Sequence, residues 1–314
     1  MVTVFHNRAR HVAASVGSLL AQTHDSLEII VVDDGSSDGT ATELRKLQDH
    51  RLDVRVQENT GFTIAIDRAV RSAKGDVIAI HGSGDISAPT RIKRQLAALE
   101  AHPKVVVAGC MVTNEASELR LPTSNRVLGT AMDFTELLQT YPMTHGEAMF
   151  HKPLFERVGG YRPFFQLGQD YDLWLRMAEH GSFLTVPEPL YRRRQFENSI
   201  NTNALKLMAQ AHYGDFAKQC AVIRERHGYD PLERFGNAGA LMARPSSELS
   251  SKLGSMGLKE LLRDNDEVSR ILIAASLNKG KNIRSLGAAA LANLKNCAPA
   301  AFGRVAGLWT RGRD

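Results

Sequence analysis

The segment LEIIVVDDGSSDGT, Leu27–Thr40, decides the fold that the sequence predicts. Its first six residues, LEIIVV, are apolar except for Glu28, a pattern typical of a β-strand buried on both faces of a sheet. The Ser-Asp-Gly sequence at residues 37–39 then breaks the chain and can cap a helix, which we expect to run through Leu47. A buried strand that passes directly into a helix is the repeating unit of α/β folds.

The same alternation continues on both sides of this segment. We expect further strands at 2–5, 54–56, 77–80 and 105–108, and further helices at 12–20, 62–70 and 87–100. This order predicts an α/β fold with a mixed, mostly parallel sheet and helices on both faces. Ligands bind such sheets beyond the carboxyl ends of the strands, so the polar residues that follow each strand are the first candidates for a site.

The second half of the chain has a less regular pattern. We expect a short helix at 133–139, strands at 145–150 and 184–186, and a helix at 171–180. Beyond Asn201 almost every segment is helical. We therefore predict two domains, an α/β domain over residues 1–200 and a helical C-terminal extension with a basic tail over residues 201–314.

Composition excludes several classes of protein. The 314 residues are 43% hydrophobic and 23% charged, which is ordinary for a soluble globular protein. The three cysteines show no CxxC spacing, which disfavours a disulfide framework or a zinc site and favours a reducing, cytoplasmic compartment. No run of about 18 apolar residues exists, and the first residues do not resemble a secretion signal.

Charge is unevenly placed along the chain. The net charge is +5, but Lys279–Asp314 holds seven basic residues and one acidic residue. A nucleic-acid-binding surface would not leave the rest of the chain near neutrality. Phe302, Val305 and Trp309 fall on one stripe of a basic helix, and such a helix can lie peripherally on the anionic inner face of a membrane. A helix packed on the domain, or a frayed tail, is the alternative.

The acids that end the first buried run are the first candidate site. Two carboxylates at a strand end, Asp33 and Asp34, can accept hydrogen bonds from the N–H edge of a nucleobase. A strand-end turn with a helix cap is the alternative, because Asp-Gly and Ser-Asp-Gly are common in turns.

Several ordered blocks of residues 1–200 resemble family-2 glycosyltransferases. They are LLAQTHDSLEIIVVDDGSSDGT, ENTGFTIAIDRAVRSAKGDVIAI, DISAPTRIKRQLAALEAHPKVVVAG and HGEAMFHKPLFERVGGYRPFFQLGQDYDLWLRMAEHG. The resemblance implies a GT-A fold and an inverting enzyme that moves a sugar from a nucleotide-sugar, with a UDP-sugar expected, to an acceptor hydroxyl. The acceptor implied by this analogy is a glycan or lipid-linked glycan in surface polysaccharide synthesis.

The resemblance also implies roles for single residues. Asp34 would contact the nucleobase, and the loop from Val4 to His6 would flank it. Asp170, in the motif GQDYDLWLRM, would be the base that takes the proton from the acceptor hydroxyl. The family's usual Glu at the preceding position is Gln169 here. The alternative is that acids simply favour the first turn of a helix, because of the helix dipole.

The acceptor side is implied by position as well. His145 and Glu147 begin the predicted strand before VGGYRP, where related enzymes place acceptor-side residues. A structural hydrogen bond is the alternative for His145. We also place Trp174, on the helix after Asp170, on the acceptor side.

The metal motif of the family is altered. Gly82 and Gly84 stand where the family usually has the two acids of a DxD-type cluster, and only Asp85 remains, one place later. A lone carboxylate is a poor site for Mg²⁺ or Mn²⁺, so we expect weak dependence on a divalent metal. The glycines would let the backbone approach the donor diphosphate instead, with Asp85 nearby. His81 is either a further metal ligand or a structural histidine.

The YRRR sequence at residues 191–194 is a candidate for the diphosphate. The resemblance implies that Arg192 and Arg194 lie near the donor phosphates, where guanidinium groups would neutralise the leaving group. A solvated charge run is the alternative.

Other functions remain as rivals. A GT-A domain that lost its metal site would act as a nucleotide- or glycan-binding module, although the intact Asp170 region argues against this. A nucleotidyltransferase would have a Gly-rich, basic loop after the first strand, where this chain reads FHNRARH. A dehydrogenase would have GxGxxG after a strand, which is absent.

Overall fold

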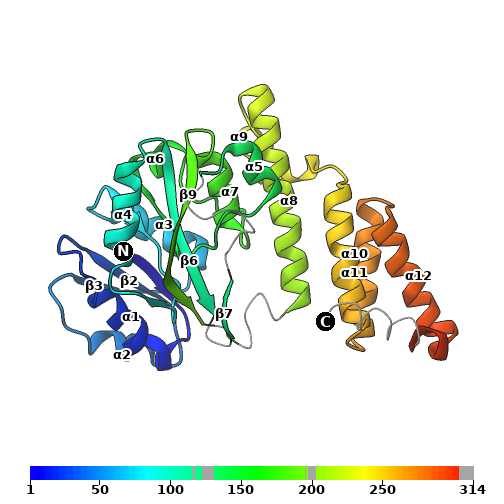
Figure 1. The fold of residues 1–314 in the computed structure, drawn as a ribbon, viewed down its shortest axis with the longest axis horizontal. Coiled ribbons are helices and arrows are strands. Elements are labelled where there is room, and N and C mark those ends of the chain that lie inside the picture. Colours follow the sequence, from blue (N-terminus) through cyan, green and yellow to red (C-terminus); the bar gives the residue numbers. More distant parts are fainter. Residues whose placement is uncertain (115–116, 122–130, 195, 197–202, 304–314) are drawn as a thin grey trace. The chain divides into compact units, whose positions relative to one another are not determined.

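The computed structural model describes the chain except for residues 115–116, 122–130, 195, 197–202 and 304–314. It divides into two compact units, Met1–Gln195 and Phe196–Asp314 (Figure 1). Among the described residues, no helix combines the length and the hydrophobicity that crossing a bilayer requires. The stripe that was expected to contact a membrane lies mostly outside the described residues, since only Phe302 of its three members is described.

The first unit contains nine strands among the described residues, with helices between them. The strands are β1 (Val2–Phe5), β2 (Ile29–Asp34), β3 (Leu52–Gln57), β4 (Val77–Ala79), β5 (Ile86–Ser87), β6 (Val105–Asn114), β7 (Ser117–Leu121), β8 (Met149–His151) and β9 (Ser182–Arg193). The helices are η1 (Ala9–His11), α1 (Val12–Leu20), α2 (Thr40–Arg45), α3 (Phe62–Ser72), α4 (Arg91–Ala101), α5 (Phe134–Gln139), α6 (Lys152–Arg157) and α7 (Gln169–Met177).

These strands form two sheets. In the first, β1, β2 and β3 are parallel, and Val2 pairs with Ile30. The second has the order β4-β8-β6-β9-β5, with β7 paired to β6, and it mixes parallel and antiparallel neighbours. A parallel bridge between Val2 and Ile80 joins the two sheets. The predicted mixed α/β fold is therefore confirmed.

The core explains why β2 sits at the centre of its sheet. All six residues of β2 are buried, as its apolar run predicted. Val12, Val16 and Leu19 of α1 share one core with Ile29 and Val31 of β2. Helix α3 packs against β1 and β2, and α4 packs against β6 and β9. The helices thus cover the strands, and the carboxyl ends of the parallel strands β1, β2 and β3 lie at one edge of the sheet, where ligands bind in such folds.

Some elements differ from their predicted bounds. The helix expected at 87–100 begins only at Arg91, because Ile86 and Ser87 pair with β9 as the short strand β5. The strand expected at 145–150 is reduced to Met149–His151, since Glu147 accepts a hydrogen bond from the Thr144 amide and holds a turn before it. The strand expected at 184–186 is much longer, and it carries the first residues of YRRR to the site.

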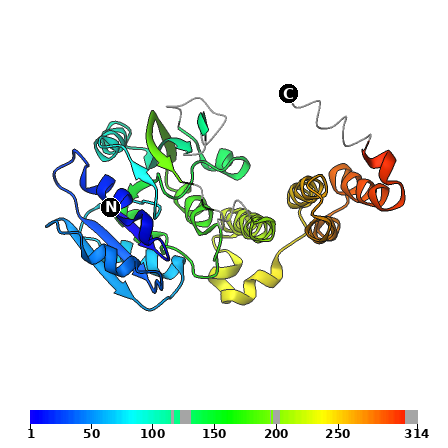
Figure 2. The same cartoon turned by 90° about the horizontal axis from the view of Figure 1, so that it is seen from below.

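The second unit is helical where it is described. It contains α8 (Ala204–His227), α9 (Pro231–Phe235), η3 (Gly236–Met242), α10 (Ser247–Leu261), α11 (Asp266–Lys279) and α12 (Ile283–Cys297). Figure 2 shows α10 and α11 nearly end-on, beside α12. Ala211 of α8 shares a core with Leu249 and Leu253 of α10 and Leu272 of α11. A Cβ atom at Gly257 would lie 2.7 Å from Ile273, so α10 and α11 approach closely only because glycine stands there.

Candidate functional site

Asp34 lies at the carboxyl edge of the parallel sheet, at the end of β2. Its Oδ1 accepts hydrogen bonds from the Thr60 amide at 2.9 Å and from Gln57 Nε2 at 2.8 Å. Its Oδ2 accepts one from the Gly61 amide at 3.0 Å. The carboxylate is 2% exposed, so in this structure it holds the turn that leads into α3. A nucleobase would reach it only by displacing one of these donors.

His6 presents a side chain at the same edge. Its ring is exposed, and Nδ1 lies 2.9 Å from the Asp34 carbonyl oxygen and 3.1 Å from Asn59 Nδ2. Val4, in contrast, is 4% exposed inside β1. Of the two residues expected to flank a base, only His6 therefore offers its side chain.

Asp85 lies after β4, in a buried network. Its Oδ2 accepts a hydrogen bond from the Tyr191 hydroxyl at 2.6 Å, and its Oδ1 accepts one from the Arg194 amide at 2.8 Å. The residue is 8% exposed. Burial raises the pKa of Asp85 to about 6, although both donors act in the opposite direction.

The two glycines beside Asp85 do not offer their amides to a ligand. The Gly82 amide donates to the Tyr191 hydroxyl at 2.8 Å, and the Gly84 amide donates to Ser15 Oγ at 3.1 Å. The expectation that these amides approach a diphosphate is therefore wrong for this conformation. A Cβ atom at Gly82 would lie 2.3 Å from Asp85 Oδ2 and 3.0 Å from the Tyr191 hydroxyl. The Asp85–Tyr191 pair fills the space that an acid at position 82 would need.

These residues do not fit a resident Mg²⁺ or Mn²⁺ ion. Both oxygens of Asp85 already accept hydrogen bonds. Across the described residues, no group of three or more His, Cys, Asp or Glu side chains is placed to hold a metal. His81 is buried between Ser15 Oγ and Ser87 Oγ, each 3.1 Å from a ring nitrogen. Burial, with a contribution from Arg91, lowers the pKa of His81 to about 3, which fits a structural role for the neutral ring.

Asp85 should make stability depend on pH. Its folded pKa of about 6 exceeds the ordinary value of 3.8, so the folded state binds more protons between pH 4 and pH 6. Its contribution to stability therefore falls as the pH rises through this window, by up to about 3 kcal/mol. Asp85→Asn should gain stability relative to the wild type between pH 4 and pH 7, in urea unfolding curves. Tyr191→Phe removes a hydrogen-bond donor to the carboxylate, so the unfolding free energy of this variant should fall more steeply with rising pH. A constant difference between Asp85→Asn and the wild type would contradict the raised pKa.

The arginines of YRRR have three different surroundings. Arg192 is exposed and pairs with Ile86 through the β5–β9 ladder. Arg193 donates to Asn114 Oδ1 at 3.1 Å. Arg194 has its amide on Asp85, and its guanidinium lies 2.7 Å from His11 Nδ1. Of the two arginines expected near a diphosphate, Arg194 is the one held beside Asp85.

Sequence reasoning missed two residues beneath this network. Tyr191 is 1% exposed and joins Asp85 to Gly82. Arg91 is fully buried, lies 4.8 Å from the centre of the Tyr191 ring, and donates to the Ile80 carbonyl at 2.8 Å. The sequence held only one local sign of this network, a tyrosine at the start of the arginine run of residues 191–194.

Asp170 lies in the first turn of α7 and is 7% exposed. Its Oδ1 accepts a hydrogen bond from the Tyr171 amide at 2.9 Å. The Tyr141 hydroxyl also hydrogen-bonds to Asp170, and burial together with this carboxylate raises the pKa of Tyr141 well above its ordinary value. The Gly168 residue before the helix has φ 73°, a conformation that favours glycine and sets the chain direction into α7.

His145 and the adjacent Gly146 lie close to residues from the surroundings of Asp34, Asp170 and Asp85. Its ring packs edge-on against Phe62, which follows the Gly61 amide that donates to Asp34. Its Nε2 lies 2.6 Å from the Tyr161 hydroxyl. Burial lowers the pKa of His145, and the Asp170 carboxylate opposes this only in part, so the ring is neutral near pH 7. The next residue, Gly146, is close enough to Tyr191 that a Cβ atom would lie 2.2 Å from its hydroxyl.

Two residues expected on the acceptor side are buried instead. Trp174 is 0% exposed and packs against Phe150 and Phe183 in the core. Glu147 is 0% exposed and accepts a hydrogen bond from the Thr144 amide at 2.6 Å. Burial raises the pKa of Glu147 to about 7. Both assignments are therefore wrong as direct contacts, because neither side chain reaches the surface. The partly buried His145 is the one that stays beside Asp170.

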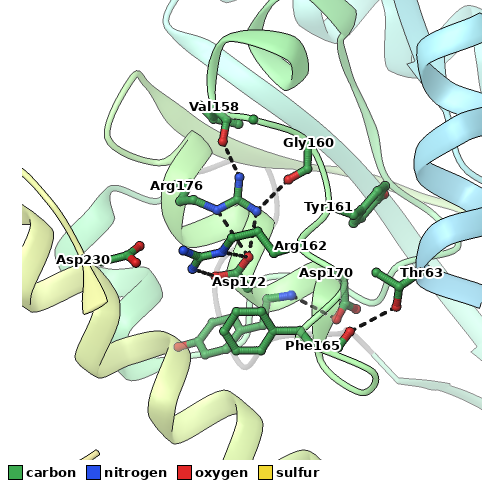
Figure 3. Close-up of polar contacts among 12 residues, drawn as sticks. Thr63, Val158, Gly160, Tyr161, Arg162, Phe165, Asp170, Asp172, Arg176 and Asp230 are labelled. Atoms are coloured by element: carbon green, nitrogen blue, oxygen red, sulfur yellow. Dashed lines mark hydrogen bonds and ion pairs between the residues drawn. The ribbon is translucent and has the colours of Figure 1, made fainter. Parts of the chain in front are cut away.

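An ion triad fixes the helix that carries Asp170. Asp172 is 1% exposed, and both Arg162 and Arg176 donate to its carboxylate, as Figure 3 shows. Arg176 also donates to the carbonyls of Val158 and Gly160, the latter at 2.8 Å. Burial alone would raise the pKa of Asp172, but the two guanidinium groups outweigh it and hold the pKa below its usual range. The VGGYRP loop and α7 are thereby joined as one unit.

The sequence of this chain is similar to those of known proteins. The model of the family described as glycosyl transferase family 2 matches residues 1–159. The putative glycosyltransferase EpsE of Bacillus subtilis is 29% identical over 222 residues, which are 65% of this chain and 78% of that protein. The O-antigen biosynthesis glycosyltransferase WbnJ of Escherichia coli is 29% identical over 227 residues, which are 68% of this chain and 85% of that protein.

Two solved structures share the fold. The mannosyltransferase PcManGT from Pyrobaculum calidifontis, in complex with GDP-Man and Mn²⁺, matches with a TM-score of 0.54 and 19% identity, over 99% of this chain and 82% of that chain. TarS 1–349 of S. aureus, in complex with UDP-GlcNAc, matches with a TM-score of 0.59 and 12% identity, over 94% of this chain and 90% of that chain. At these identities the two matches concern the fold alone.

Proposed function

Because this chain belongs to glycosyl transferase family 2, we propose that it moves a sugar from a nucleotide-diphosphate-sugar to an acceptor hydroxyl with inversion, using Asp170 as the base. The O-antigen enzyme among its relatives supports a glycan or lipid-linked glycan as the acceptor, in polysaccharide synthesis. The structural neighbours solved with UDP-GlcNAc and GDP-Man support a nucleotide-sugar donor. We place UDP-sugars first among the donors to test.

The surroundings of Asp170 are the single observation that carries this proposal. The carboxylate is nearly buried, yet among the described residues no Lys or Arg forms an ion pair with it, and Arg162 and Arg176 of the same region both donate to Asp172. The neutral ring of His145 is close enough to Asp170 to feel the charge of its carboxylate. A carboxylate without a salt-bridge partner is free to accept a proton from an attacking hydroxyl. The hydroxyl oxygen would form a new bond to the anomeric carbon. The bond between that carbon and the diphosphate oxygen would break, and the nucleoside diphosphate would leave with its electron pair.

We expect the donor to bind at the carboxyl edge of the parallel sheet. The base would lie over His6 and the Asn59 amide, next to the turn that Asp34 holds. The diphosphate would lie toward Arg194, whose backbone is fixed by Asp85. Arginine is suited to this role because its charge is permanent and its donors match phosphate geometry.

Donor binding should survive removal of divalent metal. The residues around Asp85 do not fit a resident ion, so the affinity for the donor, measured by calorimetric titration, should fall less than about tenfold in EDTA. The double variant Gly82→Asp/Tyr191→Phe restores an acid and removes the hydroxyl that holds Asp85 Oδ2 against position 82, so Asp85 can turn away and the variant should gain binding of Mn²⁺. Tyr191→Phe alone is the matched control. Complete loss of wild-type donor binding in EDTA, restored by micromolar Mn²⁺, would show that a strong metal site exists.

A thermal-shift screen of nucleotide-sugars, followed by a transfer assay, tests the proposed function. A donor at a hundred times its Kd should stabilise the fold by about 2.7 kcal/mol. Release of free nucleoside diphosphate by the wild type, lost in Asp170→Asn, supports an enzyme. Donor binding without any release of nucleoside diphosphate, with acceptors or with water, would instead identify a nucleotide-sugar-binding module.

A further inference from the structure

The second unit carries a groove that the proposed reaction does not use. It lies between α10 and α12 and has a volume of about 970 Å³. Apolar side chains from both helices line it, among them Leu258, Leu262, Ile283 and Leu291. Sites for small molecules span roughly 300–1,000 Å³ and are mostly apolar with a few polar groups that orient the ligand. The groove matches that description in both size and lining.

Helices α10 and α12 contact each other at both ends of the groove and leave a space between these contacts. They meet at Gly254, where a Cβ atom would lie 3.2 Å from Ser285. Further along, Lys295 Nζ donates to the Leu261 carbonyl at 3.2 Å. Between these contacts stands Gly287, around whose Cβ position no atom lies within 4 Å. The wall of the groove at Gly287 is therefore open space rather than packed side chains.

Three basic residues and one acidic residue line the groove. Lys252, Lys259 and Arg284 line it. In the described part of the chain, none of these three has an acidic side chain within ion-pair distance. The acid that lines the groove, Glu248, is paired with Lys218 at 2.5 Å. Apolar walls thus stand beside three cations that form no ion pair with the described residues, and Ile283 remains 92% exposed at the edge.

We propose that this groove binds a single-chain lipid that carries a phosphate group. The hydrocarbon chain would cover the apolar walls, and the phosphate would pair with Lys252, Lys259 or Arg284. A flat bilayer would meet a projecting helix face, whereas a recess between two helices suits one chain. A glycan acceptor carried on a lipid phosphate has this chemistry. That link rests on the proposed transferase function, whereas lipid binding itself does not.

Calorimetric titration of the full chain with dodecyl phosphate, below its critical micelle concentration, tests the groove. We expect saturable binding to one site. Dodecyl maltoside, with the same chain but no charge, and inorganic phosphate, without the chain, should each bind at least tenfold more weakly. Equal binding of dodecyl maltoside would overturn the role of the cations. Binding of anionic phospholipid vesicles but not of dodecyl phosphate would overturn the groove in favour of a membrane-surface contact.

Two sets of variants locate the binding. Gly287→Trp places an indole in the open space and should weaken dodecyl phosphate binding at least tenfold, whereas Ala290→Trp, on an exposed position outside the groove, should not. Replacing Lys252, Lys259 and Arg284 together by Gln should reduce the affinity to that for dodecyl maltoside. Replacing Lys206, Arg226 and Lys281, which are exposed outside the groove, is the matched control.

The outcome is independent of the transferase reaction. A cooperative thermal unfolding transition, measured without lipid, shows that a variant is folded. If Gly287→Trp does not fold, the triple Gln variant alone tests the proposal. Unchanged affinity in both Gly287→Trp and the triple Gln variant would overturn the proposal. Since the titration contains no nucleotide-sugar, its failure leaves the proposed reaction untouched, and a failure of donor binding leaves the groove untouched.

Discussion

Asp170→Asn is expected to lower turnover by at least about a hundredfold, the usual scale for loss of a general base. The amide has nearly the size of the carboxylate and can still accept the hydrogen bond from the Tyr171 amide, so the first turn of α7 should be preserved. An amide cannot take the proton of an attacking hydroxyl. The donor site does not include this side chain, so the Kd for the nucleotide-sugar should hardly change.

The measurement pairs steady-state release of nucleoside diphosphate with calorimetric titration of the donor. Gln169→Glu is the matched control, because it adds the charge that the family usually has beside the base and leaves Asp170 in place. It should retain most of the turnover. Near-normal turnover in a folded Asp170→Asn protein would remove Asp170 from the mechanism, and His145, which lies next to it, would become the first residue to test.

Asp172→Ala is expected to destabilise the protein by about 3–5 kcal/mol, although Asp172 lies only two positions from the proposed base. Its carboxylate is 1% exposed and accepts hydrogen bonds from Arg162 and Arg176. Removing it takes away the buried carboxylate that both guanidinium groups share. The loss also frees the VGGYRP loop from α7, so turnover should fall together with stability.

Urea unfolding of the wild type and the variant gives the difference in unfolding free energy. Glu43→Ala is the matched control, since it breaks an exposed ion pair with Lys46 and should cost no more than about 1 kcal/mol. A cost for Asp172→Ala as small as that of Glu43→Ala would mean that the triad does not hold the helix. The contrast with Asp170→Asn separates the two acids, because one variant should lose activity and the other should lose stability first.

Local pattern was enough for the framework of the fold. The apolar run that became β2 is buried throughout, and the i, i+3, i+4 spacing that became α3 packs against β1 and β2. Both follow from burying apolar side chains at the period of a strand or a helix, which a single sequence displays. The ordered blocks also sufficed for the family, which the match over residues 1–159 confirms. The exact ends of α4 and β8 were missed, because pairing with distant strands and turns set them.

The site was predicted less completely, because its chemistry depends on contacts far apart in the sequence. The sequence alone placed Asp34, Asp85 and Asp170 at element ends, where parallel strands and helix starts expose polar groups. Only the tertiary structure brought the Tyr191 hydroxyl onto Asp85, 106 residues away, through the register of β5 against β9. Only packing decided that Trp174 is core and that Asp172 belongs to an arginine triad. Periodicity fixes which face of an element is buried, whereas long-range register and close packing decide which polar groups meet there.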